Sequence, residues 1–138
     1  MSELDIVEAM QSRYTQVMAR VADAARRSGR KPQDVLVLAV TKLQSVEKIR
    51  AVYSAGIRAF GESYVEEALP KIETLNDLSE ARWEMVGHVQ SRKAKLVANA
   101  FSRIHSLGTQ KLARLLNRHR EPGNSPLDVL MQVNLSGE

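Results

Sequence analysis

The fold is decided by one stretch, DVLVLAVTKLQSVEKIR, which covers residues 34–50. Its residues 35–40 are all apolar, and Thr41 and Lys42 follow them directly. An uninterrupted apolar run of this length, ended by polar residues, is typical of a strand that is buried on both faces of a parallel sheet. Ser45 can then cap a helix. The stretch therefore predicts a strand followed by a helix, with Lys42 at the carboxyl end of the strand.

The same order of strand and helix repeats along the rest of the chain. The expected strands are residues 35–40, 57–60, 83–86, 103–105 and 129–133. The helices between them are expected to begin at Ser45, near Tyr64, at Ser91 and at Thr109, and Pro70 is expected to break or restart the second of them. Strands that alternate with helices in this way form βα units and a parallel sheet.

Residues 4–28 precede this alternation, and their pattern predicts an amphipathic helix. Apolar side chains recur there at three- and four-residue steps, which is the repeat of one helix face. Ser2 is a suitable N-cap, and Gly29 is a suitable helix terminator. We therefore expect a single domain over residues 1–138, in which 1–30 carry this helix and 34–138 carry the βα units.

The composition sets limits on the function. The chain has 138 residues, a net charge of +4 and no cysteine, so disulfides and thiolate metal sites are excluded. No apolar run approaches the roughly 20 residues of a membrane span, and the N-terminus lacks the features of a signal peptide. We expect a cytoplasmic protein without a membrane partner. The modest positive charge can attract phosphates, but it does not favour a nucleic-acid partner.

A parallel sheet of this kind is either open and doubly wound or part of a barrel. Open sheets that bind dinucleotides carry a glycine-rich turn after the first strand. Here that turn is TKLQS, residues 41–45, which has no glycine, so a dinucleotide-binding fold is disfavoured. Catalytic signatures of other classes are also missing: the sequence has no HExxH motif for a metal and no G-x-S-x-G motif for a serine hydrolase.

Polar residues follow each of the five expected strands. They are Thr41-Lys42, GES at 61–63, GHVQ at 87–90, HSLG at 105–108 and NLSGE at 134–138. The carboxyl ends of parallel strands meet at one rim, where barrels and open α/β sheets place their sites. The sequence therefore predicts a ligand site at this rim.

Lys42 is the most distinctive residue of this rim. Its apolar neighbours predict that its ammonium group is partly desolvated, which favours the neutral, nucleophilic amine used in Schiff-base chemistry. The alternative is that the side chain extends its charged end into solvent, and position alone slightly favours this alternative.

Four segments of the sequence carry a resemblance to a known family. They are LAVTKLQSVEKIRAVYSAGIRAFGESYVEEALPKIE, WEMVGHVQSRKAKLV, IHSLGTQKLARLLN and VLMQVNLSGE. In this order they resemble the motifs of the pyridoxal phosphate homeostasis protein family, the YggS-like proteins. The resemblance covers nearly the whole chain after the first helix. It implies an α/β fold made of parallel βα units of a TIM-type, alanine racemase-like barrel.

The resemblance also implies a cofactor and a site. The cofactor is pyridoxal 5'-phosphate (PLP), and Lys42 is the residue that would hold it as an aldimine. The other cofactor-binding candidates are Ser63, His88, Ser106 and Asn134, one from each of the remaining rim segments. A histidine that only bonds rim backbone is the commoner role, so His88 has a structural alternative. No catalytic residue is assigned, and no metal is expected.

Two departures from the family pattern affect this site. The second-strand motif of the family reads Gly-Glu-Asn, whereas this chain has Gly61-Glu62-Ser63. Serine lacks the separate amide donor and carbonyl acceptor of asparagine, so an asparagine-type contact is not available at Ser63. The chain also has five expected strands, against about eight in a closed barrel. We therefore expect a C-terminally shortened, incomplete barrel without the phosphate loops that follow strands 7 and 8, and weak cofactor affinity.

Three functions remain open at this point. The leading one is a PLP-binding homeostasis protein that holds and hands over the cofactor. A PLP-dependent racemase-like enzyme is second, because Tyr14, Tyr53 and Tyr64 match no motif for a second acid or base. A half-barrel binding module that has lost the cofactor is third, including weak RNA binding through its basic helices. In each case the two open edges of a five-stranded sheet predict that two copies associate.

Overall fold

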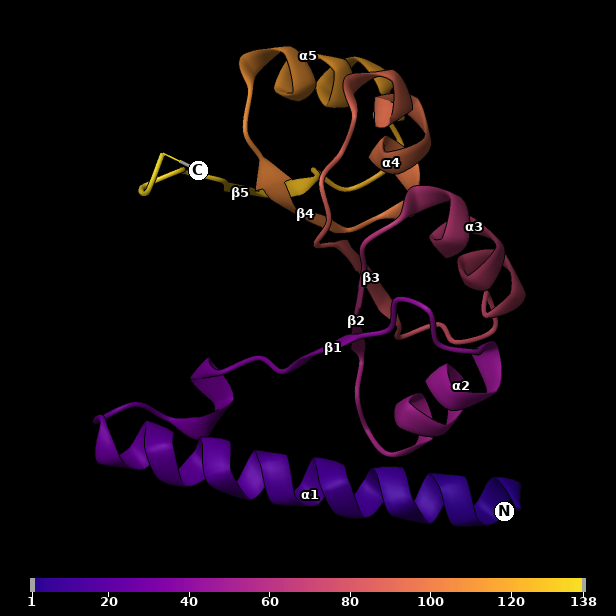
Figure 1. Ribbon diagram of the computed structural model, residues 1–138, viewed down its shortest axis with the longest axis vertical. Helices are drawn as coiled ribbons and strands as arrows, with labels where there is room; N and C mark the ends of the chain where they lie inside the picture. Colours follow the sequence, from indigo (N-terminus) through magenta and orange to yellow (C-terminus); the bar gives the residue numbers. More distant parts are fainter. Residues whose placement is uncertain (1, 138) are drawn as a thin grey trace.

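The computed structural model describes residues 2–137. Five parallel strands form one sheet in chain order: β1 Leu38–Val40, β2 Ala59–Glu62, β3 Arg82–Met85, β4 Arg103–Leu107 and β5 Asp128–Met131. The helices are α1 Glu3–Arg27, α2 Val46–Ser54, α3 Val65–Thr74, α4 Ala94–Ala100 and α5 Gln110–His119, with 3₁₀ turns η1 Pro32–Asp34 and η2 Ser91–Lys93. Figure 1 shows a curled sheet with α2 to α5 on its convex side. The predicted α/β fold, an incomplete parallel barrel, is confirmed.

The core lies between the convex face of the sheet and helices α2 to α5. The strands contribute Phe60, Trp83, Met85 and Ile104, all of them buried. The ring centroids of Phe60 and Trp83 are 5.3 Å apart. Burial of one such side chain stabilises the fold by roughly 1.5–3 kcal/mol. This apolar layer fixes the strands and therefore the rim at their carboxyl ends.

The helix ends follow the signals in the sequence. The Ser2 hydroxyl accepts the Asp5 N–H while the Asp5 carboxylate accepts the Ser2 N–H, which is a complete capping box. Gly29 follows α1 with a φ of 74°, a conformation that favours glycine. The hydroxyls of Ser45 and Thr109 accept a backbone N–H in the first turns of α2 and α5. These caps confirm the predicted starts of three helices and the end of α1.

Several predicted features of the helices and strands were wrong; the second strand, for example, is Ala59–Glu62 rather than 57–60. Pro70 lies inside an unbroken α3, because Ala68 and Lys71 on either side of it are buried and hold the helix against the sheet. Ser91 is not a side-chain cap: it begins η2, whose first turn has no side-chain cap hydrogen bond. The first strand is residues 38–40 rather than 35–40, because only these three pair with β2.

The concave face of the sheet has no covering layer within residues 2–137. Val40 of β1 is 53% exposed, and all four residues of β5 are exposed. The prediction that the first strand is buried on both faces was therefore wrong, because the helices cover the convex side alone (Figure 1). In this part of the chain β1 and β5 each pair with a strand on one side only.

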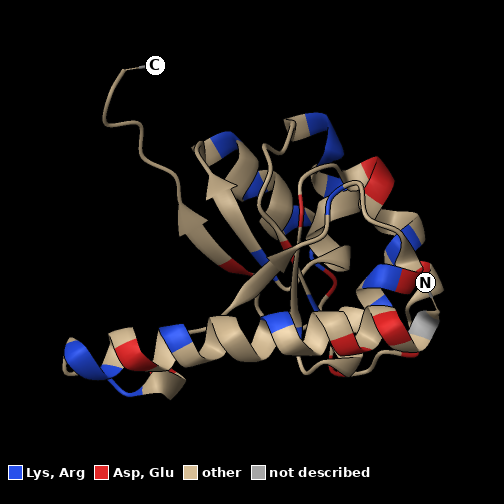
Figure 2. Cartoon of the chain, turned by 60° about the horizontal axis from the view of Figure 1, so that its bottom comes forward, with Lys and Arg blue, Asp and Glu red and all other residues tan. Residues whose placement is uncertain are grey.

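Helix α1 packs against α2 and against the η1 turn, beside the β1 end of the sheet (Figure 1). It packs where α2 ends: a Cβ added at Gly56 would lie 3.2 Å from the ring of Tyr14. In Figure 2 the acidic residues of α1 lie mainly towards its N-terminal end and the basic residues mainly towards its C-terminal end. Between residues 2 and 137, no helix has the length and apolar character needed to cross a membrane.

Candidate functional site

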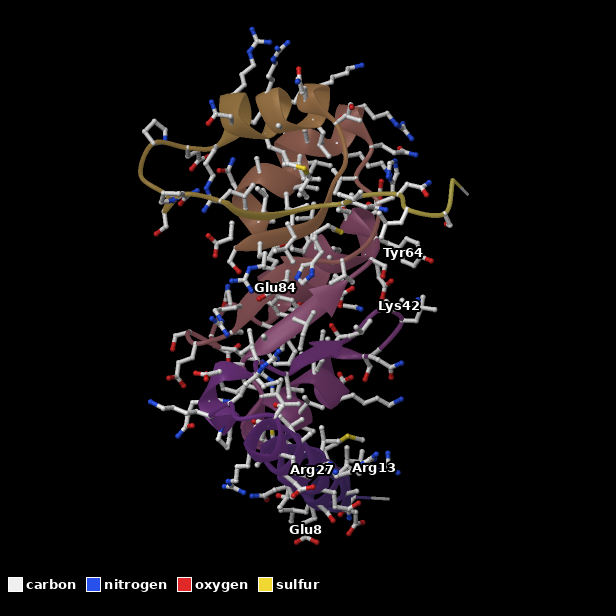
Figure 3. The ribbon with its side chains drawn as sticks, turned by 90° about the vertical axis from the view of Figure 1, so that its left-hand side faces the viewer. Glu8, Arg13, Arg27, Lys42, Tyr64 and Glu84 are labelled. Atoms are coloured by element: carbon white, nitrogen blue, oxygen red, sulfur yellow. The ribbon has the colours of Figure 1, made fainter. Side chains whose placement is uncertain are left out.

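The five residues predicted for the site lie along one rim of the sheet. Lys42, Ser63, His88 and Asn134 each follow a strand, and Ser106 is the penultimate residue of β4. Because the strand order is the chain order, these residues follow the arc of the rim from β1 to β5. Figure 3 shows Lys42 and Tyr64 at this edge.

Lys42 is exposed, so the expectation of a partly desolvated amine was wrong. The physical reason is its strand: β1 has three residues, pairs only with β2 among the described strands, and ends in the half-exposed Val40. In Figure 3 the side chain of Lys42 extends away from the ribbon at the rim. A ligand can therefore reach this amine directly from solvent.

The backbone around Lys42 forms a tight turn. The Thr41 N–H donates to the Gly61 carbonyl at 2.8 Å, which extends the β1–β2 ladder to the residue before the lysine. The Gln44 N–H donates to the Thr41 carbonyl at 3.1 Å and closes the turn. Leu43 has a φ of 60°, the only positive φ among the non-glycine residues of 2–137. Such a conformation is uncommon for a side chain with a Cβ, and it stores backbone strain.

A buried ionic cluster lies directly beneath this turn. Glu62, at the end of β2, is fully buried, and the side chain of Lys71 from α3 is only 10% exposed. The Lys71 ammonium donates to both Glu62 oxygens at 3.1 and 3.3 Å, and to the Thr41 carbonyl at 2.9 Å. The Thr41 hydroxyl donates to Glu62 Oε1 at 2.7 Å. These bonds pair the Glu62 and Lys71 charges and also contact the turn that carries Lys42.

Glu67 connects the same cluster to the far side of the turn. Its carboxylate accepts a hydrogen bond from Lys71 and, at 2.6 Å, from the N–H of Leu43. The hydrogen bond from Lys71 holds the pKa of Glu67 below its ordinary value; partial burial opposes this effect, and the Leu43 N–H adds to it. Glu67 is thus an anion that binds the residue following Lys42.

Ser63 and His88 share a pocket of about 380 Å³ between the β2–α3 and β3–α4 connections. Lys93 also lines this pocket, where it forms an ion pair with Glu66 of α3. The two connections approach each other closely at Gly87, where an added Cβ would lie 2.2 Å from the Ser63 carbonyl oxygen. The pocket brings together a hydroxyl, an imidazole and an amine at the rim.

The remaining two candidates have different surroundings. Ser106 is buried, and its hydroxyl donates to the Gly87 carbonyl at 2.6 Å, which ties β4 to the residue before His88. Asn134 is exposed beyond β5, and its side-chain oxygen accepts the Gly137 N–H at 2.8 Å. The structure therefore connects Ser63, His88 and Ser106, whereas Lys42 and Asn134 lie towards opposite ends of the arc.

A second charged cluster lies on the strands themselves, where Figure 3 labels Glu84. Glu84 is buried, and a 2.6 Å hydrogen bond joins its carboxylate to His105. Arg103 lies 3.5 Å from the same carboxylate and 3.2 Å from Asp128 of β5. This network crosses three adjacent strands. It gives His105 a carboxylate partner on the neighbouring strand.

These observations define a class of protein: a parallel (β/α)-barrel chain with its polar site at the carboxyl ends of the strands. No family model matches the chain. It is 42% identical over 122 residues to the pyridoxal phosphate homeostasis protein of Pseudomonas aeruginosa, an alignment that covers 88% of this chain and 53% of that protein. The chain belongs to the pyridoxal phosphate homeostasis protein family, and it spans about half the length of the curated relatives it matches.

Solved structures agree with this assignment. The crystal structure of an unknown protein from Bifidobacterium adolescentis has a TM-score of 0.76 at 26% identity, over 83% of this chain and 50% of that one. PipY of Synechococcus elongatus, solved with PLP bound, has a TM-score of 0.60 at 38% identity, over 72% of this chain and 47% of that one. The similarity thus extends from sequence to three-dimensional structure.

The buried cluster of Glu62, Glu67 and Lys71 was not predicted from the sequence. One signal for it was present, because Lys71 lies three residues after Ala68 and four before Leu75, both of them buried. A lysine on the apolar face of an amphipathic helix indicates a buried partner, since an unpaired buried charge is costly. The identity of that partner depends on the β2–α3 packing, which local spacing does not specify.

Proposed function

We propose that this chain binds PLP at the carboxyl rim of its sheet and acts in PLP homeostasis, with Lys42 as the site of covalent attachment. The observation that carries this proposal is the exposed amine of Lys42 on a turn whose backbone is bonded on both sides of the lysine. The names of the relatives and the PLP bound to PipY support it. The proposed location is the cytoplasm, as expected from the sequence.

The residues present fit the reactive end of the cofactor. Bound PLP supplies an aldehyde, and a neutral primary amine condenses with an aldehyde with loss of water. Lys42 offers a primary amino group to solvent, whereas Lys71 is buried and bonded to two carboxylates. Along the same rim, Ser63 and His88 offer hydrogen-bonding groups in one pocket. The roles of Ser63, His88, Ser106 and Asn134 as further contacts remain part of the proposal.

Reductive trapping tests the proposal directly. The protein is incubated with PLP, reduced with borohydride and digested, and the labelled peptides are mapped by mass spectrometry. We expect the label at Lys42, and loss of visible absorbance by Lys42→Ala but not by Lys48→Ala. Lys48 is a matched control because it is an exposed lysine only six residues further along the chain. A label spread equally over Lys48 and Lys93 would contradict the proposal. Amino-acid turnover by the loaded protein would indicate a racemase-like enzyme instead.

We also propose that two copies of this chain associate through their open sheet edges. The paired edges would be β1 and β5, which present unpaired backbone groups and exposed apolar side chains such as Val40 and Leu130. Edges of this kind pair readily with other strands, and closed two-fold dimers are the commonest assembly.

Sedimentation velocity at several concentrations tests this association. We expect a monomer–dimer equilibrium that Leu130→Lys weakens, because a charged side chain on an edge strand opposes pairing. Leu96→Lys is the control, since Leu96 has a similar exposure, 47% against 49%, but lies on α4. A monomer over the whole concentration range, or an equal effect of both substitutions, would refute the proposal.

A further inference from the structure

We infer that Lys71, Glu62 and Glu67 form a positioning device for Lys42, which fixes the turn that presents its amine at the rim. This inference rests on the proposed function for its purpose, but its geometry stands independently of PLP. Glu62 ends β2 and is fully buried, whereas Lys71 and Glu67 lie on α3 with side chains that are 10% and 25% exposed. We call these three residues the α3 cluster.

Stability alone does not explain the α3 cluster. Glu62 is completely buried and the Lys71 side chain nearly so, and removing two charges from water costs several kcal/mol per ion before their attraction compensates. Replacing a buried ion pair with apolar residues of similar volume is often neutral or stabilising. The neighbouring positions Ala68 and Leu75 show that this face of α3 accepts apolar side chains. A cluster of this kind therefore points to a structural specificity that apolar packing would not supply.

The hydrogen bonds of the cluster show what that specificity is. Lys71 binds the carbonyl of Thr41, and Glu62 binds the hydroxyl of the same residue. Glu67 binds the N–H of Leu43. The bonds thus end on the two residues that flank Lys42, and they leave the lysine side chain itself free to extend from the turn.

The strained conformation of Leu43 requires such bonds. A positive φ in a residue with a Cβ persists only where the surroundings impose it. Packing does not impose it here, because the Leu43 side chain is 76% exposed. The hydrogen bond from its N–H to Glu67 is a local constraint in addition to the Gln44-to-Thr41 bond that closes the turn, and Lys71 in turn holds the Glu67 carboxylate. The chain of contacts therefore runs from the buried Glu62 through Lys71 and Glu67 to the turn.

The test compares Lys71→Met, Glu67→Ala and Glu67→Gln with the control Lys48→Met. The first readout is hydrogen exchange of the Leu43 amide without PLP, measured by NMR. Loss of one charge-assisted hydrogen bond should speed this exchange about tenfold or more in Lys71→Met and Glu67→Ala. Glu67→Gln keeps an acceptor oxygen and should restore slow exchange in part. Lys48→Met should leave it unchanged.

The second readout is the fraction of Lys42 trapped by PLP and borohydride, which should fall in the first two variants and not in the control. Glu67→Ala alters only a half-buried residue, so it keeps the test valid if Lys71→Met does not fold. Slow Leu43 exchange in Lys71→Met and Glu67→Ala, with trapping equal to that of the unmodified chain, would overturn the inference. If the unmodified chain is not trapped at Lys42 at all, the proposed function fails, while the exchange measurements still decide whether the α3 cluster positions the turn.

Discussion

The substitution Gly87→Ala should disrupt the rim more than the same substitution at any other glycine of the chain. Gly87 follows β3, and its backbone passes against the residue that follows β2. A Cβ at this position would lie 2.2 Å from the Ser63 carbonyl oxygen and 2.8 Å from two further backbone atoms of Ser63. Backbone atoms cannot rotate out of the way as the end of a flexible side chain does.

The magnitude follows from this geometry. The carbon–oxygen contact must open from 2.2 Å to at least 3.0 Å, so the two connections must separate by the better part of an ångström. Overpacking of this kind typically costs about 1–3 kcal/mol. The shift also strains the 2.6 Å hydrogen bond from Ser106 to the Gly87 carbonyl. We therefore expect Gly87→Ala to lower the free energy of unfolding by about 2–3 kcal/mol.

Urea unfolding followed by circular dichroism measures this loss. Gly108→Ala is the matched control: Gly108 follows β4 at the same rim, and an added Cβ there meets no atom within 4 Å. The control should change the free energy of unfolding by less than about 0.5 kcal/mol. If Gly87→Ala proves as stable as Gly108→Ala, the close approach of the two connections does not exist in solution.

Three further substitutions or conditions have defined outcomes. Phe60→Ala removes a fully buried ring of the core and should cost about 3–5 kcal/mol in urea unfolding; a loss below 1 kcal/mol would contradict its burial. Lys42→Ala should change the unfolding free energy by less than about 0.5 kcal/mol without PLP, because the side chain is exposed, and a loss of several kcal/mol would make Lys42 structural. Glu67 has a lowered pKa in the folded protein, so the folded state binds fewer protons than the unfolded state just below the ordinary value of 4.5. The contribution of Glu67 to the free energy of unfolding is therefore present above pH 4.5 and lost as the pH falls through the lowered pKa. Between pH 3 and 6 the free energy of unfolding should depend less on pH in Glu67→Gln than in the unmodified chain. Identical pH profiles of the two proteins would refute this.

The order of elements was predictable because each of them follows from a local pattern. The helical repeat of apolar residues and the N-capping residues predict where the helices lie. A strand followed by a helix and another strand implies that the two strands pair in parallel. The same reasoning put Lys42, Ser63 and His88 at one rim, as the structure confirms. Burial was less predictable, because an apolar run such as 35–40 does not reveal whether a second layer covers its strand. The exposure of Val40 depends on which face of the sheet the helices cover, and that is a property of the whole sheet.

The two lysines of this site illustrate how a sequence pattern can predict burial for the wrong lysine. Lys42 follows an apolar strand and is exposed, whereas Lys71 lies in a charged helix and is buried. Under the proposed function the amino group of Lys42 meets an aldehyde that arrives from solvent, and its exposure at the rim suits that role. An amine that holds a backbone turn in place must instead keep fixed partners, and burial beside Glu62 gives Lys71 those partners at 3.1 and 3.3 Å. A buried charge near a rim is then better interpreted as support for the reactive residue than as the reactive residue itself, because the bonds that hold it also remove it from reaction.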